Sequence, residues 1–128
     1  VAQFIGHTNM IEGKVAEDLG NRNYIIDWAK FRLPCHTPLK LQLGKKVALA
    51  LRYEKIKVNP IESGEDIAIT GKVLEKTYMG SITRLDINLE NKIIVTADLP
   101  SNEFVESIKI GRKVKVSWLV ESLTVLED

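Results

Sequence analysis

The sequence predicts an all-β protein made of two related, small β-barrel lobes, with one short helix in the second lobe. Three observations lead to this prediction. Apolar residues come in short β-rich runs between turn residues, part of the chain occurs twice, and the last long strand of each copy changes its alternation midway. With 128 residues, the chain is long enough for two small lobes that stabilise each other.

The apolar runs define the expected strands and their turns. We expect strands at 13–19, 23–29, 30–34, 46–58, 68–78, 81–89, 92–99 and 113–126. The segments "LGNRN" at 19–23 and "LENK" at 89–92 supply the Gly and Asn residues that tight hairpins need for positive φ. One helix is expected at 102–109, because Ser101 can cap it, Glu103 stands in its first turn and Gly111 follows its end.

The internal repeat covers both ends of each lobe. "GKVAE" at 13–17 returns as "GKVLE" at 71–75, and "LGKKVALALRYEKIKV" at 43–58 returns as "IGRKVKVSWLVESLTV" at 110–125. The second copy is longer, and we place its extra residues in the helical segment at 98–109. The expected division is a junction at 1–12, a first lobe at 13–61 and a second lobe at 62–128, interleaved into one structural domain and linked by "ESGED" at 62–66.

The closing strands each change phase. In the first copy Val47, Leu49 and Leu51 alternate on one face, whereas Ile56 and Val58 take the opposite phase. The second copy repeats this change. Since side chains alternate with period two, a phase change requires a bulge or corner, as in small barrels of the oligonucleotide/oligosaccharide-binding (OB) shape. The corners are predicted at Tyr53–Glu54 and Val120–Glu121.

Composition narrows the possible partners. Eighteen basic and seventeen acidic residues give a net charge of +1, which provides no long-range attraction for nucleic acid or an anionic membrane. The sequence has no apolar run of membrane-spanning length, so we expect contact with a membrane only through a partner. Cys35 is the only cysteine, which excludes an internal disulfide and agrees with a cytoplasmic location.

Motifs for catalysis or cofactors are missing. Gly13-Lys14 and Gly71-Lys72 are each followed by valine and do not form a phosphate-binding P-loop. Cys35 and His36 are adjacent and would point to opposite faces of a strand, and His7 stands in a loop, so no metal site is expected. Two histidines without a nearby nucleophile do not support hydrolysis. We therefore expect no enzymatic activity and no cofactor in this chain. Eight aromatic residues, several on apolar faces, give little support to the alternative of a single-strand nucleic-acid binder.

Carboxylates and aromatic residues of the second lobe form the remaining candidate site. They could hold an organic cation such as a polyamine by charge pairing and cation–π contact. The alternative is that they are solvated strand faces and surface ion pairs. The candidates are Glu75, Tyr78, Asp86, Asp98, Trp118 and Glu121.

Three stretches resemble a known family over nearly all of the chain: "VAQFIGHTNMIEGKV", "GKKVALALRYEKIKV" and 71–100 with 113–126. Together they are similar to the carboxy-terminal, transport-associated OB-type domain of ATP-binding subunits of bacterial ABC importers. Spermidine/putrescine importers are the closest in pattern, and iron(III), sulfate and sugar importers share much of it. Tyr53 departs from the family, which more often has proline there. The residues that carry the polyamine-type resemblance are Phe4, Ile5, Gly6, Asn9, Met10, Trp118, Val120, Glu121 and Ser122.

The resemblance implies a division of labour. A separate ATPase domain would bind ATP and Mg and drive import, and this chain would pair two ATP-binding subunits as a homodimer and respond to a small-molecule regulator. Membrane permease subunits would be further partners, which places the protein at the cytoplasmic face of the bacterial membrane. An alternative within the same fold is an oxyanion sensor using backbone amides with Ser81 or Lys72.

Overall fold

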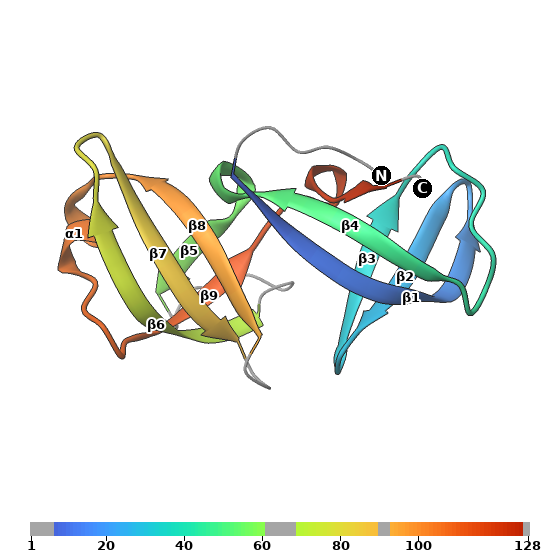
Figure 1. The fold of residues 1–128 in the computed structure, drawn as a ribbon, viewed down its shortest axis with the longest axis horizontal. Helices are drawn as coiled ribbons and strands as arrows, with labels where there is room; N and C mark the ends of the chain where they lie inside the picture. The colour runs from blue at the N-terminus through green and yellow to red at the C-terminus, as the bar shows by residue number, and fades with distance from the viewer. Residues whose placement is uncertain (1–6, 61–68, 90–92, 127–128) are drawn as a thin grey trace. The chain divides into compact units, whose positions relative to one another are not determined.

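The computed structural model describes residues 7–60, 69–89 and 93–126. It confirms an all-β fold with one short α-helix (Figure 1). The chain forms two compact units: unit 1 is Val1–Leu51 with Leu119–Asp128, and unit 2 is Arg52–Trp118. The expected link at 62–66, the turn residues 90–92 and the family-like residues 4–6 lie outside the described residues.

Unit 1 is a five-stranded sheet in the order β10-β4-β1-β2-β3. Buried residues such as Ile11, Val15, Ile26 and Leu49 alternate along its strands and form the core. Residues 8–12, which we expected in the junction, belong to the first strand, because Ile11 enters this core. The strands are β1 (Thr8–Gly20), β2 (Asn23–Trp28), β3 (Phe31–His36), β4 (Lys46–Arg52) and β10 (Thr124–Val125).

Unit 2 repeats this arrangement in the order β5-β9-β6-β7-β8. Its core contains Val73, Leu85, Ile87 and Val114, all nearly inaccessible to solvent. The helix α1 (Glu103–Ser107) connects β8 to β9. The strands are β5 (Lys57–Pro60), β6 (Ile69–Tyr78), β7 (Ile82–Leu89), β8 (Ile94–Pro100) and β9 (Lys113–Ser117).

The fifth strand of each unit comes from the other copy of the sequence repeat. β5 continues the closing strand of the first sequence copy, yet it pairs with β9 of unit 2. β10 continues the closing strand of the second copy, yet it pairs with β4 of unit 1. The structural units therefore differ from the expected lobes at 13–61 and 62–128. The reason is that each closing strand is interrupted at its phase change, so its second half hydrogen-bonds to a different sheet from its first half.

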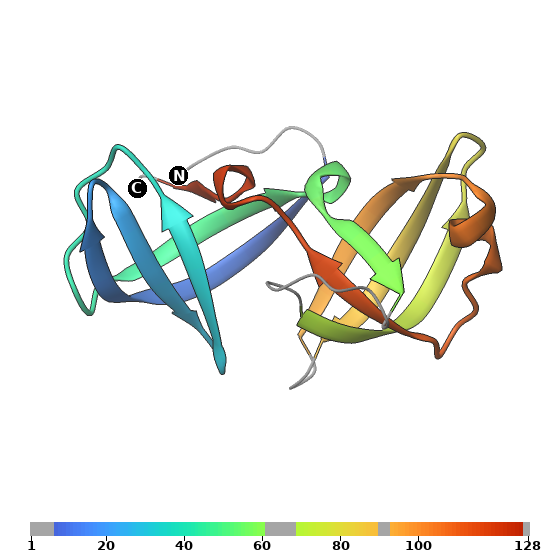
Figure 2. The same cartoon turned by 180° about the vertical axis from the view of Figure 1, so that it is seen from behind.

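Both predicted corners are present as 3₁₀ turns, η1 (Tyr53–Lys55) and η3 (Val120–Ser122). Figure 2 shows the chain passing from β4 through a coiled turn into β5, and from β9 through a second turn into the last strand. No residue within either turn is buried, and the next residue, Ile56 or Leu123, returns to the core. Tyr53 replaces the usual proline without preventing the turn.

The duplication extends to individual backbone hydrogen bonds. The amide of Gly44 donates to the carbonyl of Val15 at 2.8 Å, and the amide of Gly111 donates to that of Val73 at 2.7 Å. Register shifts follow Val15 and Val73 at the same position of each copy. Gly44 and Gly111 have φ of 82° and 94°, a conformation that glycine adopts without steric cost. The sequence repeat therefore encodes a repeated hydrogen-bonding pattern.

The helix is shorter than expected and has a different cap. Asn102, not Ser101, is the N-cap, and its side-chain oxygen accepts from the amide of Val105 at 2.9 Å. The hydroxyl of Ser101 instead donates to the carbonyl of Gly80 at 2.8 Å and ties the β6–β7 turn to the end of β8. The helix stops before Ile108 because that residue is extended. Asn and Ser are comparable caps, so tertiary contacts decided between them.

The hydroxyl of Tyr24 holds the loop after β3 by hydrogen bonds to its backbone. It accepts from the amide of Leu41 at 3.2 Å and donates to the carbonyl of Leu39 at 3.5 Å, and the side chain is buried. Replacing Tyr24 with phenylalanine leaves a buried amide unpaired, so we expect the free energy of unfolding in urea to fall by about 1–2 kcal/mol. The control is Tyr78→Phe, an exposed tyrosine whose substitution should change nothing measurable. Equal effects of the two substitutions would contradict this role.

Candidate functional site

The outer face of β6, β7 and β8 gathers most of the predicted cation-binding carboxylates. Leu85 and Ile87 point into the core of unit 2, so the intervening residues of β7 point outward. The strand register aligns Glu75, Asp86 and Thr96 in one row. It aligns Thr77, Arg84 and Asp98 in the next row. We call this surface, defined by Glu75, Arg84, Asp86, Thr96 and Asp98, the acidic face.

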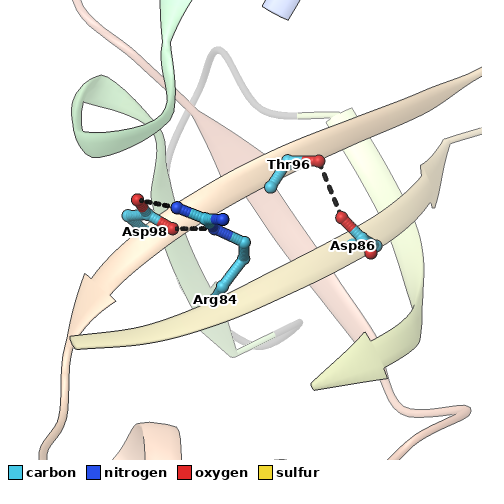
Figure 3. A network of polar contacts seen from close by, with 4 residues as sticks. All are labelled: Arg84, Asp86, Thr96 and Asp98. Carbon is cyan, nitrogen blue, oxygen red and sulfur yellow. Dashed lines mark hydrogen bonds and ion pairs between the residues drawn. The ribbon is translucent and has the colours of Figure 1, made fainter. Parts of the chain in front are cut away.

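Arg84 lies in the middle of one row of the acidic face, between Thr77 and Asp98. Its Nε donates to Oδ1 of Asp98 at 2.7 Å and its Nη2 donates to Oδ2 at 3.0 Å, a bidentate ion pair (Figure 3). The two side chains are 25% and 15% exposed, so the pair is partly shielded from water. The hydrogen bond to Asp98 is the main cause that raises the pKa of Arg84. Asp98 is therefore already paired with a cation from its own unit.

The same guanidinium lies over the ring of Tyr53, 5.1 Å from its centroid. This cation–π contact attaches the 3₁₀ turn η1 to the acidic face. Neither Arg84 nor Tyr53 was among the predicted site residues. Strand alternation could have revealed Arg84, because it has the same phase as Asp86 in "TRLDIN" at 83–88. Tyr53 carries no such signal, because its contact with β7 arises only in three dimensions.

Asp86 and Glu75 form the other end of the acidic face. Oδ1 of Asp86 accepts from the hydroxyl of Thr96 at 2.7 Å, as Figure 3 shows. Glu75 is exposed and stands directly opposite Asp86 on the neighbouring strand. Like charges directly opposite each other destabilise a sheet. A cation bound between these two carboxylates would relieve that repulsion.

The remaining predicted residues lie elsewhere. Tyr78 ends β6 and is exposed, opposite Thr83 rather than opposite Asp86. Trp118 follows β9 and is half-buried. Glu121 lies in η3 and belongs to unit 1. The structure thus brings three of the six predicted residues, Glu75, Asp86 and Asp98, onto one face.

The cysteine and histidine residues do not form a site within the described ranges. Cys35 is buried and His36 is exposed, which confirms that they point to opposite faces of β3. Burial raises the pKa of the Cys35 thiol. The described residues contain no group of three side chains that could hold a metal ion. In the same part of the chain, every helix is too short or too polar to cross a bilayer.

The two residues of the oxyanion alternative are far apart along the β6–β7 hairpin. Lys72 pairs with Asn88 near the start of β6. Ser81 lies in the turn beyond the other end of that strand, where its carbonyl accepts from the amide of Ser101. They do not form one site.

This chain is similar to proteins of one known family. A family model described as the TOBE domain matches residues 49–126. The chain is 28% identical over 126 residues to the spermidine/putrescine import ATP-binding protein PotA of Hahella chejuensis, covering 93% of this chain and 33% of that protein. It is 26% identical over 130 residues to PotA of Vibrio cholerae, covering 100% of this chain and 34% of the relative. The chain thus spans about a third of the length of these curated relatives.

A solved structure shares the fold. The cytoplasmic molybdate-binding protein ModG, in a form with molybdate bound, superposes with a TM-score of 0.81. The match covers 96% of this chain and 98% of the ModG chain at 17% sequence identity. At that identity the likeness establishes the architecture.

Proposed function

Because this chain belongs to the TOBE domain family, we propose that it is the regulatory tail of the ATP-binding subunit of an ABC importer. The observation that carries this proposal is the match of nearly the whole chain to about a third of the PotA proteins, in their C-terminal region. The fold is consistent with it, since a TOBE-type β architecture is compatible with a role in contact, and the described residues contain no group of three side chains that could hold a metal ion.

In this proposal the work is divided between domains. ATP and Mg bind to the ATPase domain of the parent protein, and this chain contributes no catalytic residue. The sister ATP-binding subunit and the membrane permease subunits are the partners, at the cytoplasmic face of the membrane. Spermidine and putrescine are the proposed substrates, supported by the names of the relatives in several organisms.

A chimera tests the tail role. The matching C-terminal third of a spermidine/putrescine import ATP-binding protein is replaced by this chain, and spermidine uptake is measured in cells that lack the native subunit. We expect the chimera to restore uptake well above the level of a subunit truncated at the same position. The proposal fails if the chimera accumulates as a folded ATPase yet supports no more uptake than the truncated control.

Direct polyamine binding is a separate prediction about the acidic face. Glu75 and Asp86 provide two adjacent carboxylates, and neither is in an ion pair within 4 Å among the described residues, although Arg84 also attracts Asp86 electrostatically. Spermidine at ten times its Kd should therefore stabilise the folded chain by about 1.4 kcal/mol, measured as a rise in Tm. Glu75→Gln should abolish the rise, whereas the control Glu12→Gln, on the outer side of β1, should preserve it. If spermidine and putrescine both leave Tm unchanged, the chain does not bind polyamines and the tail role alone remains.

Oxyanion sensing is the second candidate. The ModG structure with bound molybdate favours it, since the two chains share a fold over nearly their whole lengths. Iron(III), sulfate or sugar transport by the parent importer is a further alternative. Molybdate and sulfate in the same Tm measurement distinguish the candidates, because a rise with molybdate and none with spermidine would favour the oxyanion sensor.

A further inference from the structure

Unit 1 contains a pocket of about 510 Å³ that neither the importer role nor the acidic face uses. Its walls come from three segments, residues 39–41, 45–48 and 125–126. All of them belong to unit 1. The pocket therefore requires the exchanged strand β10, which supplies Val125.

Hydrogen bonds hold these walls in place. The Tyr24 hydroxyl binds the backbone of Leu39 and Leu41, and Oγ1 of Thr37 accepts from the amide of Leu39 at 3.2 Å. The amide of Leu126 donates to the carbonyl of Ala48 at 3.0 Å. Backbone hydrogen bonds thus hold the segments that line the pocket.

All charged side chains among the described residues that line this pocket are positive. Lys40, Lys45 and Lys46 line it, and its described lining includes no acidic side chain. Within the described residues these three lysines have no ion pair or side-chain hydrogen bond. Three unpaired cations in one depression are a marked concentration for a chain whose net charge is +1. Such an arrangement attracts an anion.

A neighbouring pocket provides an internal comparison. It has a similar volume of about 530 Å³ and is also part of unit 1. Lys46 lines both pockets. In this second pocket it stands with Lys14, Glu12 and Asp27, so two positive and two negative side chains of the described residues line it. Of these two pockets, only the first is lined by lysines without a carboxylate from the described part of the chain.

We propose that the pocket formed by residues 39–41, 45–48 and 125–126 binds a small organic phosphate with two or more negative charges. Its volume is several times that needed by a simple oxyanion and lies in the range of pockets for organic ligands. Lysine ammonium groups bind phosphate oxygens as point charges, and three of them suit a diphosphate better than a single phosphate. Leu39, Leu41 and Val125 supply apolar contact for the organic part of the ligand.

Calorimetric titration of the 128-residue chain with ADP, pyrophosphate and sulfate tests this proposal. We expect ADP to bind more tightly than sulfate, with affinity that falls as salt is added. Lys40→Gln with Lys45→Gln should weaken ADP binding by about tenfold for each lysine removed, because each substitution removes a charge-assisted hydrogen bond. The matched control is Lys109→Gln with Lys113→Gln, which removes the same charge from unit 2.

Three outcomes would overturn the proposal. The first is that neither ADP nor pyrophosphate binds at millimolar concentration. The second is that the control pair weakens binding as much as the pocket pair, which would show general charge attraction. The third is that sulfate binds as tightly as ADP through the same lysines, which would make the pocket a simple oxyanion site. The result is independent of polyamine binding, because spermidine and the acidic face are not involved.

Discussion

Replacing Leu123 with alanine is expected to destabilise unit 1 by about 2–5 kcal/mol. Leu123 is 2% exposed and directly follows the 3₁₀ turn η3. By sequence it belongs to the second copy, but by structure it belongs to unit 1. Removing its side chain therefore leaves a cavity in the core formed mainly by the first part of the chain.

Hydrogen exchange measured by mass spectrometry locates this effect. Backbone protection should fall first in residues 8–51, at the opposite end of the sequence from the substitution. The control is Leu119→Ala, because Leu119 is 51% exposed only four residues earlier and its loss should change the free energy of unfolding by less than about 0.5 kcal/mol. Loss of protection confined to residues 93–117 would show that the strand exchange is wrong.

The second large effect is expected from replacing Gly13 with alanine, which should lower the free energy of unfolding by about 3 kcal/mol. A Cβ atom at this position would lie 2.5 Å from Cγ2 of Ile26 and 2.7 Å from the carbonyl oxygen of Asp27. The carbonyl is part of the β1–β2 ladder and cannot move without breaking strand pairing. Urea denaturation should show a lower midpoint with an unchanged slope.

The equivalent glycine in unit 2 offers a matched comparison. At Gly71 a Cβ would meet Cγ2 of Ile87 at 2.5 Å and Cδ2 of Leu89 at 3.0 Å, whereas the nearest backbone oxygen is 3.3 Å away. Side chains can move more readily than a paired carbonyl. Gly71→Ala should therefore lower the free energy of unfolding by less than Gly13→Ala does. The opposite order would mean that the backbone at Gly13 relaxes freely. Both glycines open the repeated "GKV" segment, which gives the repeat a steric reason.

The acidic face shows how far the sequence can place candidate residues in space. Carboxylates of the second lobe were expected to gather with Tyr78 and Trp118. Of these residues, Glu75, Asp86 and Asp98 lie on one face. The sequence could not reveal that Asp98 is bound to Arg84 within the same unit, since this pairing depends on the register between β7 and β8. The charge available to a ligand is therefore smaller than the number of acidic residues suggests.

The sequence by itself determined most of the strand positions, the hairpin at 20–22 and the places of both corners. These features depend on local rules, namely the alternation of side chains with period two and the backbone conformations that Gly and Asn adopt. The sequence did not show that residues 8–12 belong to β1 or that the corners are 3₁₀ turns. Gly20 and Asn21 have positive φ, as the turn segment "LGNRN" predicts. Arg22 also has positive φ, which the segment did not predict. The repeat also made two similar sheets predictable, because equivalent segments follow the same local rules.

Only the tertiary structure decided which sheet each half of a closing strand joins. A phase change requires a corner but does not say where the chain goes after it, because that depends on which sheet edge offers unpaired backbone groups. The same holds for the cap at Asn102, the contact of Arg84 with Tyr53 and the lysine-lined pocket of unit 1. Each of them joins residues that are distant in sequence or chooses between equivalent neighbours, and contacts of that kind arise only when the strands have packed.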